Sequence, residues 1–143
     1  MRRISYREIG GYKYKLTEDC GPVAVQTGIR PRLTIRTRYV VLYDDGILRI
    51  LPGYAWDGPS GPTFDTPAFM RGSLYHDALY QLMSEGHIPW RHQEAADRLL
   101  WKTCREDGMG RLRAWYVRKA VNAFGKRCAQ SARKRRKLVY WAP

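Results

Sequence analysis

Apolar and polar residues alternate along much of the first half of the chain, as they do in half-exposed β-strands. Residues 12–16 and 33–36 show this alternation, residues 23–25 form a short apolar stretch, and residues 38–43 and 47–51 are rich in β-branched and aromatic side chains. Asp44, Asp45 and Gly46 join the last two runs and can form a turn with positive φ. The pattern predicts antiparallel strands, with residues 38–51 as a hairpin.

Helical spacing of apolar residues replaces this alternation in the second half of the chain. The first predicted helix begins at Pro67 and ends near Gly86, the second covers residues 89–108, and the third begins near Gly110 and is broken or bent at Gly125. Strands followed by helices predict an α+β fold, in which an antiparallel β-meander is followed by three helices packed on the sheet.

A turn-rich segment, residues 52–63, separates the two halves. It contains three prolines and three glycines, and its apolar residues follow neither the helical nor the strand period. Such a segment is expected to be a stiff, shaped loop rather than a regular element.

The net charge of the 143-residue chain is +13, and the excess is concentrated at one end. Residues 101–143 hold 13 of the 26 Lys and Arg residues but only two of the 13 acids. We expect a single domain over residues 1–125 and a basic tail over residues 126–143. Because a run of like charges resists helix formation, the tail is expected to become ordered on a partner.

Three widely spaced cysteines, Cys20, Cys104 and Cys128, fit neither a disulfide framework nor a zinc site. They indicate synthesis in a reducing cytoplasm. The sequence contains no secretory signal pattern and no apolar run near the roughly 20 residues of a membrane span, so no transmembrane segment is expected.

The strongest candidate for chemistry is the pair His76 and Asp77 on the first predicted helix. The two side chains lie about 100° apart around the helix, and Tyr80 follows His76 by one turn on the same face. An imidazole can transfer protons, and a neighbouring carboxylate can bind a cation. Asp97 lies in an apolar part of the second predicted helix, where a carboxylate is costly unless it is paired. The imidazole of His76 is its natural partner.

The preceding loop can contribute to the same site through Asp57 and its neighbours Gly58, Ser60 and Pro62. A loop of this composition can turn carbonyl groups towards a hard cation and leave N–H groups free for an oxyanion. In the structural alternative, His76 and Asp77 only hydrogen-bond the loop and fasten it to the helix. His87 and His92 are expected to be solvated, because their spacing with His76 fits no closed zinc site.

Three motifs together resemble a family of small proteins of unknown function encoded by tailed bacteriophages and prophages. The resemblance covers roughly residues 53–124 and rests on the Trp-Asp-Gly-Pro-Ser-Gly-Pro loop at 56–62, the segment with His76 and Asp77 at 73–80, and the segment with Asp97 at 94–98. It implies a phage or prophage origin and an accessory or virion-associated role, with other phage structural or lysis proteins as partners, but no particular activity.

The His-Asp-Ala-Leu-Tyr segment that begins at His76 is also similar to the active-site helix of phospholipase A2 enzymes, which reads His-Asp-x-Cys-Tyr. This resemblance implies that His76 activates a water molecule, that Asp77 and the loop over residues 54–61 bind calcium, and that Asp97, supported by Tyr80, holds His76. Leu79 stands where the family has cysteine, and the loop departs from the family's calcium loop. The resemblance to phospholipase A2 implies a calcium-dependent hydrolase.

The basic tail is the other functional signal. Its cations could contact phosphate groups of DNA or RNA, an anionic membrane or an acidic protein in a virion, or they could simply be solvated. The residues concerned are Lys126, Arg127, Arg133, Lys134, Arg135, Arg136 and Lys137. The sequence therefore leaves three hypotheses: a phage accessory component, a hydrolase, and a non-specific nucleic-acid-binding protein.

Overall fold

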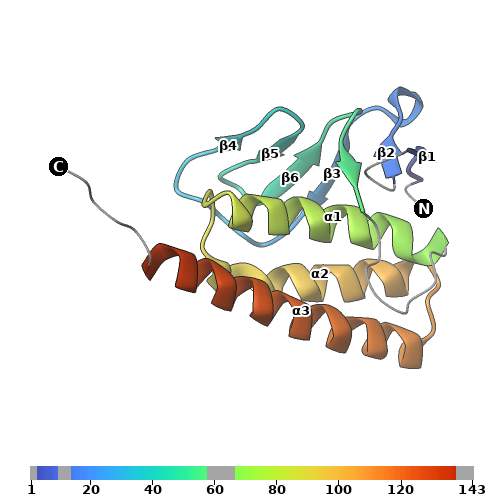
Figure 1. The fold of residues 1–143 in the computed structure, drawn as a ribbon. Helices are drawn as coiled ribbons and strands as arrows, with labels where there is room; N and C mark the ends of the chain where they lie inside the picture. Colours follow the sequence, from blue (N-terminus) through green and yellow to red (C-terminus); the bar gives the residue numbers. More distant parts are fainter. Residues whose placement is uncertain (1–2, 10–13, 58–66, 138–143) are drawn as a thin grey trace.

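The computed structural model describes residues 3–9, 14–57 and 67–137, without the side chains of residues 20, 124, 128, 129 and 131–137. Strands fill the first part and helices the second, so the predicted α+β fold is confirmed (Figure 1). The strands are β1 (Tyr6–Glu8), β2 (Tyr14–Leu16), β3 (Val23–Gln26), β4 (Ile35–Arg36), β5 (Val40–Leu42), β6 (Ile47–Ile50) and β7 (Ala55–Trp56). The helices are α1 (Pro67–Ser84), α2 (Gln93–Glu106) and α3 (Arg111–Lys137), with short 3₁₀ turns at Glu18–Cys20 and Trp90–His92.

The strands form two antiparallel sheets, one in the order β3-β6-β5-β4 and the other in the order β1-β2-β7. The predicted hairpin is present, because β5 pairs with β6 in the register Val41 to Arg49. Its turn contains Gly46 at a φ of 91°, and the backbone N–H of Ile47 donates to Asp45 Oδ1. Local turn chemistry therefore sets the register of these strands.

One strand occupies part of the segment that was expected to be irregular throughout. Ala55 and Trp56 form β7 and pair with Lys15 and Tyr14 of β2, so the prediction of no regular structure over residues 52–63 is wrong at this point. A strand of two residues is too short to show alternation of apolar and polar positions, so its pairing with β2 determines its conformation. The pairing holds Trp56, and with it Asp57, against the body of the fold.

Helix α1 is the central element of the core. Its buried residues occur around most of its circumference, which is typical of a helix covered on several sides. Leu74, Leu79 and Leu82 share one buried cluster with sheet residues such as Leu42 and Ile50. On another side, Phe69 packs with Leu100 and Cys104 of α2 and Val117 of α3. Polar side chains on α1 are consequently held in the interior.

Helix α3 passes Gly125 without interruption and ends at Lys137, so the predicted break is wrong. Gly125 permits a close crossing: a Cβ atom here would lie 2.6 Å from Gln93 Nε2 and would also collide with Tyr80 Oη. The missing side chain brings α3 against α1 and α2. The division of the chain into a domain ending at residue 125 and a tail stays a prediction.

Candidate active site

Three helices bring a group of polar side chains together in the interior. His76 and Tyr80 come from α1, Asp97 from α2 and Asn122 from α3. His76 and Tyr80 are only 6% and 8% exposed and Asp97 is fully buried. A buried carboxylate is stable only if hydrogen-bond donors surround it, so its partners are the first feature to establish.

The carboxylate of Asp97 is contacted by the other three side chains. Its Oδ1 lies 2.8 Å from His76 Nε2 and accepts a hydrogen bond of 2.8 Å from Tyr80 Oη. Its Oδ2 accepts a longer hydrogen bond of 3.3 Å from Asn122 Nδ2. The pairing of His76 with Asp97 predicted from the sequence is therefore present, and Tyr80 supports Asp97 as the phospholipase resemblance implied.

The second ring nitrogen of His76 faces Asp77. His76 Nδ1 lies 3.6 Å from Asp77 Oδ1, which is too long for a strong hydrogen bond. Burial lowers the pKa of His76, but the neighbouring carboxyl groups of Asp77 and Asp97 together outweigh it, and the pKa is raised above its usual value. The ring is therefore held by Asp97 on one side and faces a second carboxyl group on the other.

Asp57 is brought to Asp77 by the anchoring of the preceding tryptophan. Trp56 Nε1 donates a hydrogen bond of 3.1 Å to Ser73 Oγ in the interior, one helical turn before Asp77. The backbone of Asp57 hydrogen-bonds to the Asp77 carboxyl group. Burial raises the pKa of Asp77, and the nearby charge of Asp57 acts in the same direction. The Asp77 side chain is still 29% exposed, so Asp77 lies at the edge of the site.

The remaining sequence-predicted residues are not gathered here. Gly58, Ser60 and Pro62 lie outside the described residues. His87 is paired with Glu85 at 3.3 Å, away from His76. Within residues 3–9, 14–57 and 67–137 no group of three or more His, Cys, Asp or Glu residues is placed to hold a metal ion by itself. Lys126 and Arg127 are exposed on α3, and the basic residues from Arg133 onwards have helical backbone, with side chains outside the description.

Asn122 is the member of the site that the sequence did not reveal. Besides its contact with Asp97, Asn122 donates a hydrogen bond of 2.9 Å from Nδ2 to Glu94 Oε1. Its backbone carbonyl oxygen accepts a hydrogen bond of 3.0 Å from Gln93 Nε2. It therefore fastens α3 across α2 next to the buried carboxylate. Only the close approach of α3 at Gly125 creates these contacts, and no spacing within the sequence indicates them.

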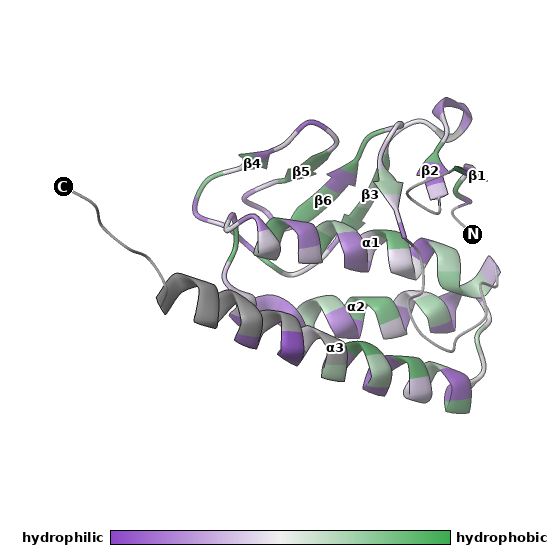
Figure 2. Ribbon diagram, viewed as in Figure 1, coloured by the Kyte–Doolittle hydropathy of each residue, from purple (hydrophilic) through white to green (hydrophobic). Residues whose placement is uncertain are grey.

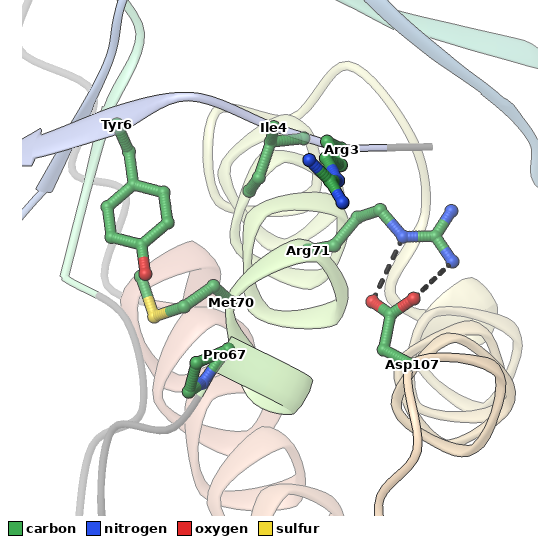
Figure 3. A pocket seen from close by; sticks show the side chains of 7 residues that line it. All are labelled: Arg3, Ile4, Tyr6, Pro67, Met70, Arg71 and Asp107. Atoms are coloured by element: carbon green, nitrogen blue, oxygen red, sulfur yellow. Dashed lines mark hydrogen bonds and ion pairs between the residues drawn. The ribbon is translucent and has the colours of Figure 1, made fainter. Parts of the chain in front are cut away.

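A separate pocket of about 330 Å³ lies between the N-terminal strand and the first turn of α1 (Figure 3). One wall is the ion pair in which the Arg71 guanidinium binds both carboxylate oxygens of Asp107, at 3.0 and 2.8 Å. The rest of the lining is Arg3, Ile4, Tyr6, Pro67 and Met70. None of the predicted catalytic or metal-binding residues lines this pocket, so it is distinct from the His76 site.

No protein-family model, curated protein or solved structure matches this chain. The geometry of the His76 site and the sequence motifs therefore carry the functional argument.

The arrangement at His76 has a defined chemical capability. A buried carboxylate that accepts a hydrogen bond from the N–H of one imidazole nitrogen fixes the tautomer and leaves the other nitrogen basic. In this site the fixed nitrogen would be Nε2 and the basic nitrogen Nδ1, which faces the partly exposed Asp77. Such an imidazole is suited to general acid–base chemistry.

Proposed function

We propose that this chain is a hydrolase in which His76 is the general base, and that it serves as an accessory or virion-associated protein of a tailed phage or prophage. The observation that supports a hydrolase is the contact of His76 Nε2 with the fully buried Asp97, which also accepts a hydrogen bond from Tyr80. A proton on Nε2 would leave Nδ1 as the basic nitrogen. The phage role is supported by the sequence motifs alone.

The reaction that suits this geometry is hydrolysis of an ester by an activated water molecule. Nδ1 of His76 accepts a proton from water while the water oxygen attacks the carbonyl carbon, and the ester C–O bond then breaks. The proton on Nδ1 passes to the departing alkoxide, which restores the neutral imidazole. Asp97 keeps its hydrogen bond to Nε2 throughout and stabilises the transient imidazolium, and a base placed in this way contributes about 10²–10⁴-fold to a rate.

Calcium is the cation that we propose for the edge of the site. Asp77 offers a hard carboxylate oxygen 3.6 Å from His76 Nδ1 and is partly exposed, and Asp57 is near enough to Asp77 to act on its pKa. Calcium takes about six to eight oxygen ligands, so backbone carbonyl groups or water would have to complete the shell of these two carboxylates. The carboxylate oxygens of Asp77 and Asp57 are the kind of ligand that calcium prefers. When bound, the ion would stabilise negative charge on the substrate carbonyl oxygen.

Replacement of Asp77 by asparagine is expected to abolish calcium binding, because one carboxylate is lost from a site that has two among the described residues. Isothermal calorimetry of calcium into the wild type and Asp77→Asn measures this, with Asp44→Asn as a matched control in an exposed hairpin turn. Heat of binding that is equal in the wild type and Asp77→Asn would remove the metal from the proposal. Hydrolysis without added calcium then shows whether His76 acts alone.

A further inference from the structure

An exposed apolar and aromatic patch lies on the outer face of α3. Leu112, Trp115 and Tyr116 are 81%, 55% and 47% exposed. At 100° per residue, these three side chains share one face of the helix with Lys119. Ala114 and Val117 occupy the opposite face and are buried against α2. Large apolar side chains scattered singly are ordinary on a protein surface, but three within two turns of one face are a patch.

Cations extend the same face towards the C-terminal end of the helix. Lys119 Nζ lies 5.8 Å from the centre of the Trp115 ring, and Lys126 and Arg127 follow on this face and are exposed. Residues 111–137 contain 11 Lys and Arg residues and no acid. Figure 1 shows α3 along the side of the molecule away from the strands, and Figure 2 shows hydrophobic residues in the first half of the helix.

We propose that this face of α3, defined by Leu112, Trp115, Tyr116, Lys119, Lys126 and Arg127, docks on an anionic lipid bilayer. A helix that lies in a membrane interface inserts aliphatic and aromatic residues below the headgroups and directs Lys and Arg to anionic lipids. Tryptophan and tyrosine suit the boundary because each ring is apolar with one polar atom. Docking requires no catalysis, so it stands or falls separately from the hydrolase.

The charge and the apolar part of the face together select this partner. A second copy of the chain would bring two acid-free cationic helices together, which repel one another. A nucleic acid would engage the cations and could stack on the aromatic rings, but it gives an 81% exposed leucine no apolar contact. A bilayer accommodates Leu112 and the cations at the same time.

Co-sedimentation with vesicles tests the proposal. The full chain is expected to bind vesicles of equal parts phosphatidylglycerol and phosphatidylcholine, and to bind pure phosphatidylcholine much more weakly. The double variant Leu112→Ser and Trp115→Ser should bind the anionic vesicles at least about tenfold more weakly, because two side chains no longer leave water. Both residues are exposed, so circular dichroism should show an unchanged fold.

Leu33→Ser is the matched control, since Leu33 is 77% exposed but lies outside α3. Its binding to vesicles should equal that of the wild type. Absence of binding to anionic vesicles, or equal binding by the double variant and the wild type, would overturn the proposal. A third result would also overturn it: the wild type binds an oligonucleotide at physiological salt but no vesicles, and the double variant binds the oligonucleotide more weakly. The face would then recognise nucleic acid.

Discussion

Replacement of His76 by glutamine is expected to lower kcat/KM for ester hydrolysis by about 10²–10⁴-fold, which is the usual contribution of a general base. Glutamine has an amide N–H that can still donate to Asp97, but it has no basic nitrogen that can take a proton from water. The loss should therefore fall on the chemical step and not on the fold. A suitable measurement is hydrolysis of para-nitrophenyl butyrate with calcium present, together with the free energy of unfolding of each protein.

His87→Gln is the matched control for this substitution. His87 has a side chain that is 39% exposed and is paired only with Glu85 in the structure as described, so its replacement should leave hydrolysis unchanged. If His76→Gln kept the wild-type rate and lost only stability, His76 would be a structural clasp between α1 and α2. That outcome would support the structural alternative, in which His76 and Asp77 only hold parts of the fold together.

The largest loss of stability is expected for Asp97→Ala, at about 3–5 kcal/mol. The carboxylate is fully buried and is contacted by His76, Tyr80 and Asn122, so its removal takes this acceptor away from three side chains, of which His76 and Tyr80 are buried. It also opens a small cavity where α1, α2 and α3 meet. Urea unfolding followed by circular dichroism gives the free energy directly.

Glu94→Ala serves as the comparison for Asp97→Ala, because Glu94 lies one turn earlier on α2, is exposed, and accepts a hydrogen bond from Asn122. It should lose well under about 1 kcal/mol, as exposed polar contacts usually do. A similarly small loss for Asp97→Ala would mean that the three hydrogen bonds contribute little, and that the carboxylate does not organise the site.

The parts of the fold that the sequence predicted are those with local signals. The hairpin of β5 and β6 follows from alternation around Asp44, Asp45 and Gly46, and α1 follows from Pro67 and helical spacing. Strands β1 and β7 were missed because two or three residues carry no period, and only their pairing with β2 makes them strands.

The error at Gly125 has a different physical origin. Sequence reasoning counts the cost of a glycine within a helix, about 1 kcal/mol relative to alanine. It has no means of counting the close approach that the missing side chain allows, here to Tyr80 and Gln93. The same approach places Asn122 beside Asp97, which is why that member of the site was also missed.

The contact between His76 and Asp97 was easier to predict than the position of Asp57. A carboxylate in an apolar stretch requires a partner, and this requirement connects Asp97 with His76 from the sequence alone. The position of Asp57 depends on a long-range contact, the hydrogen bond from Trp56 to Ser73, which no local pattern encodes. The proposed roles of Asp57 and Asp77 in calcium binding stay predictions.

The most direct test of the account is to observe which nitrogen of His76 carries the proton when the ring is neutral. Nitrogen-15 NMR of the imidazole groups distinguishes the tautomers, and His87 and His92 serve as internal references. The account predicts that Nε2, which contacts Asp97, is protonated and that Nδ1 is not. A proton on Nδ1, directed at Asp77, would contradict the account, because that nitrogen could no longer take a proton from water.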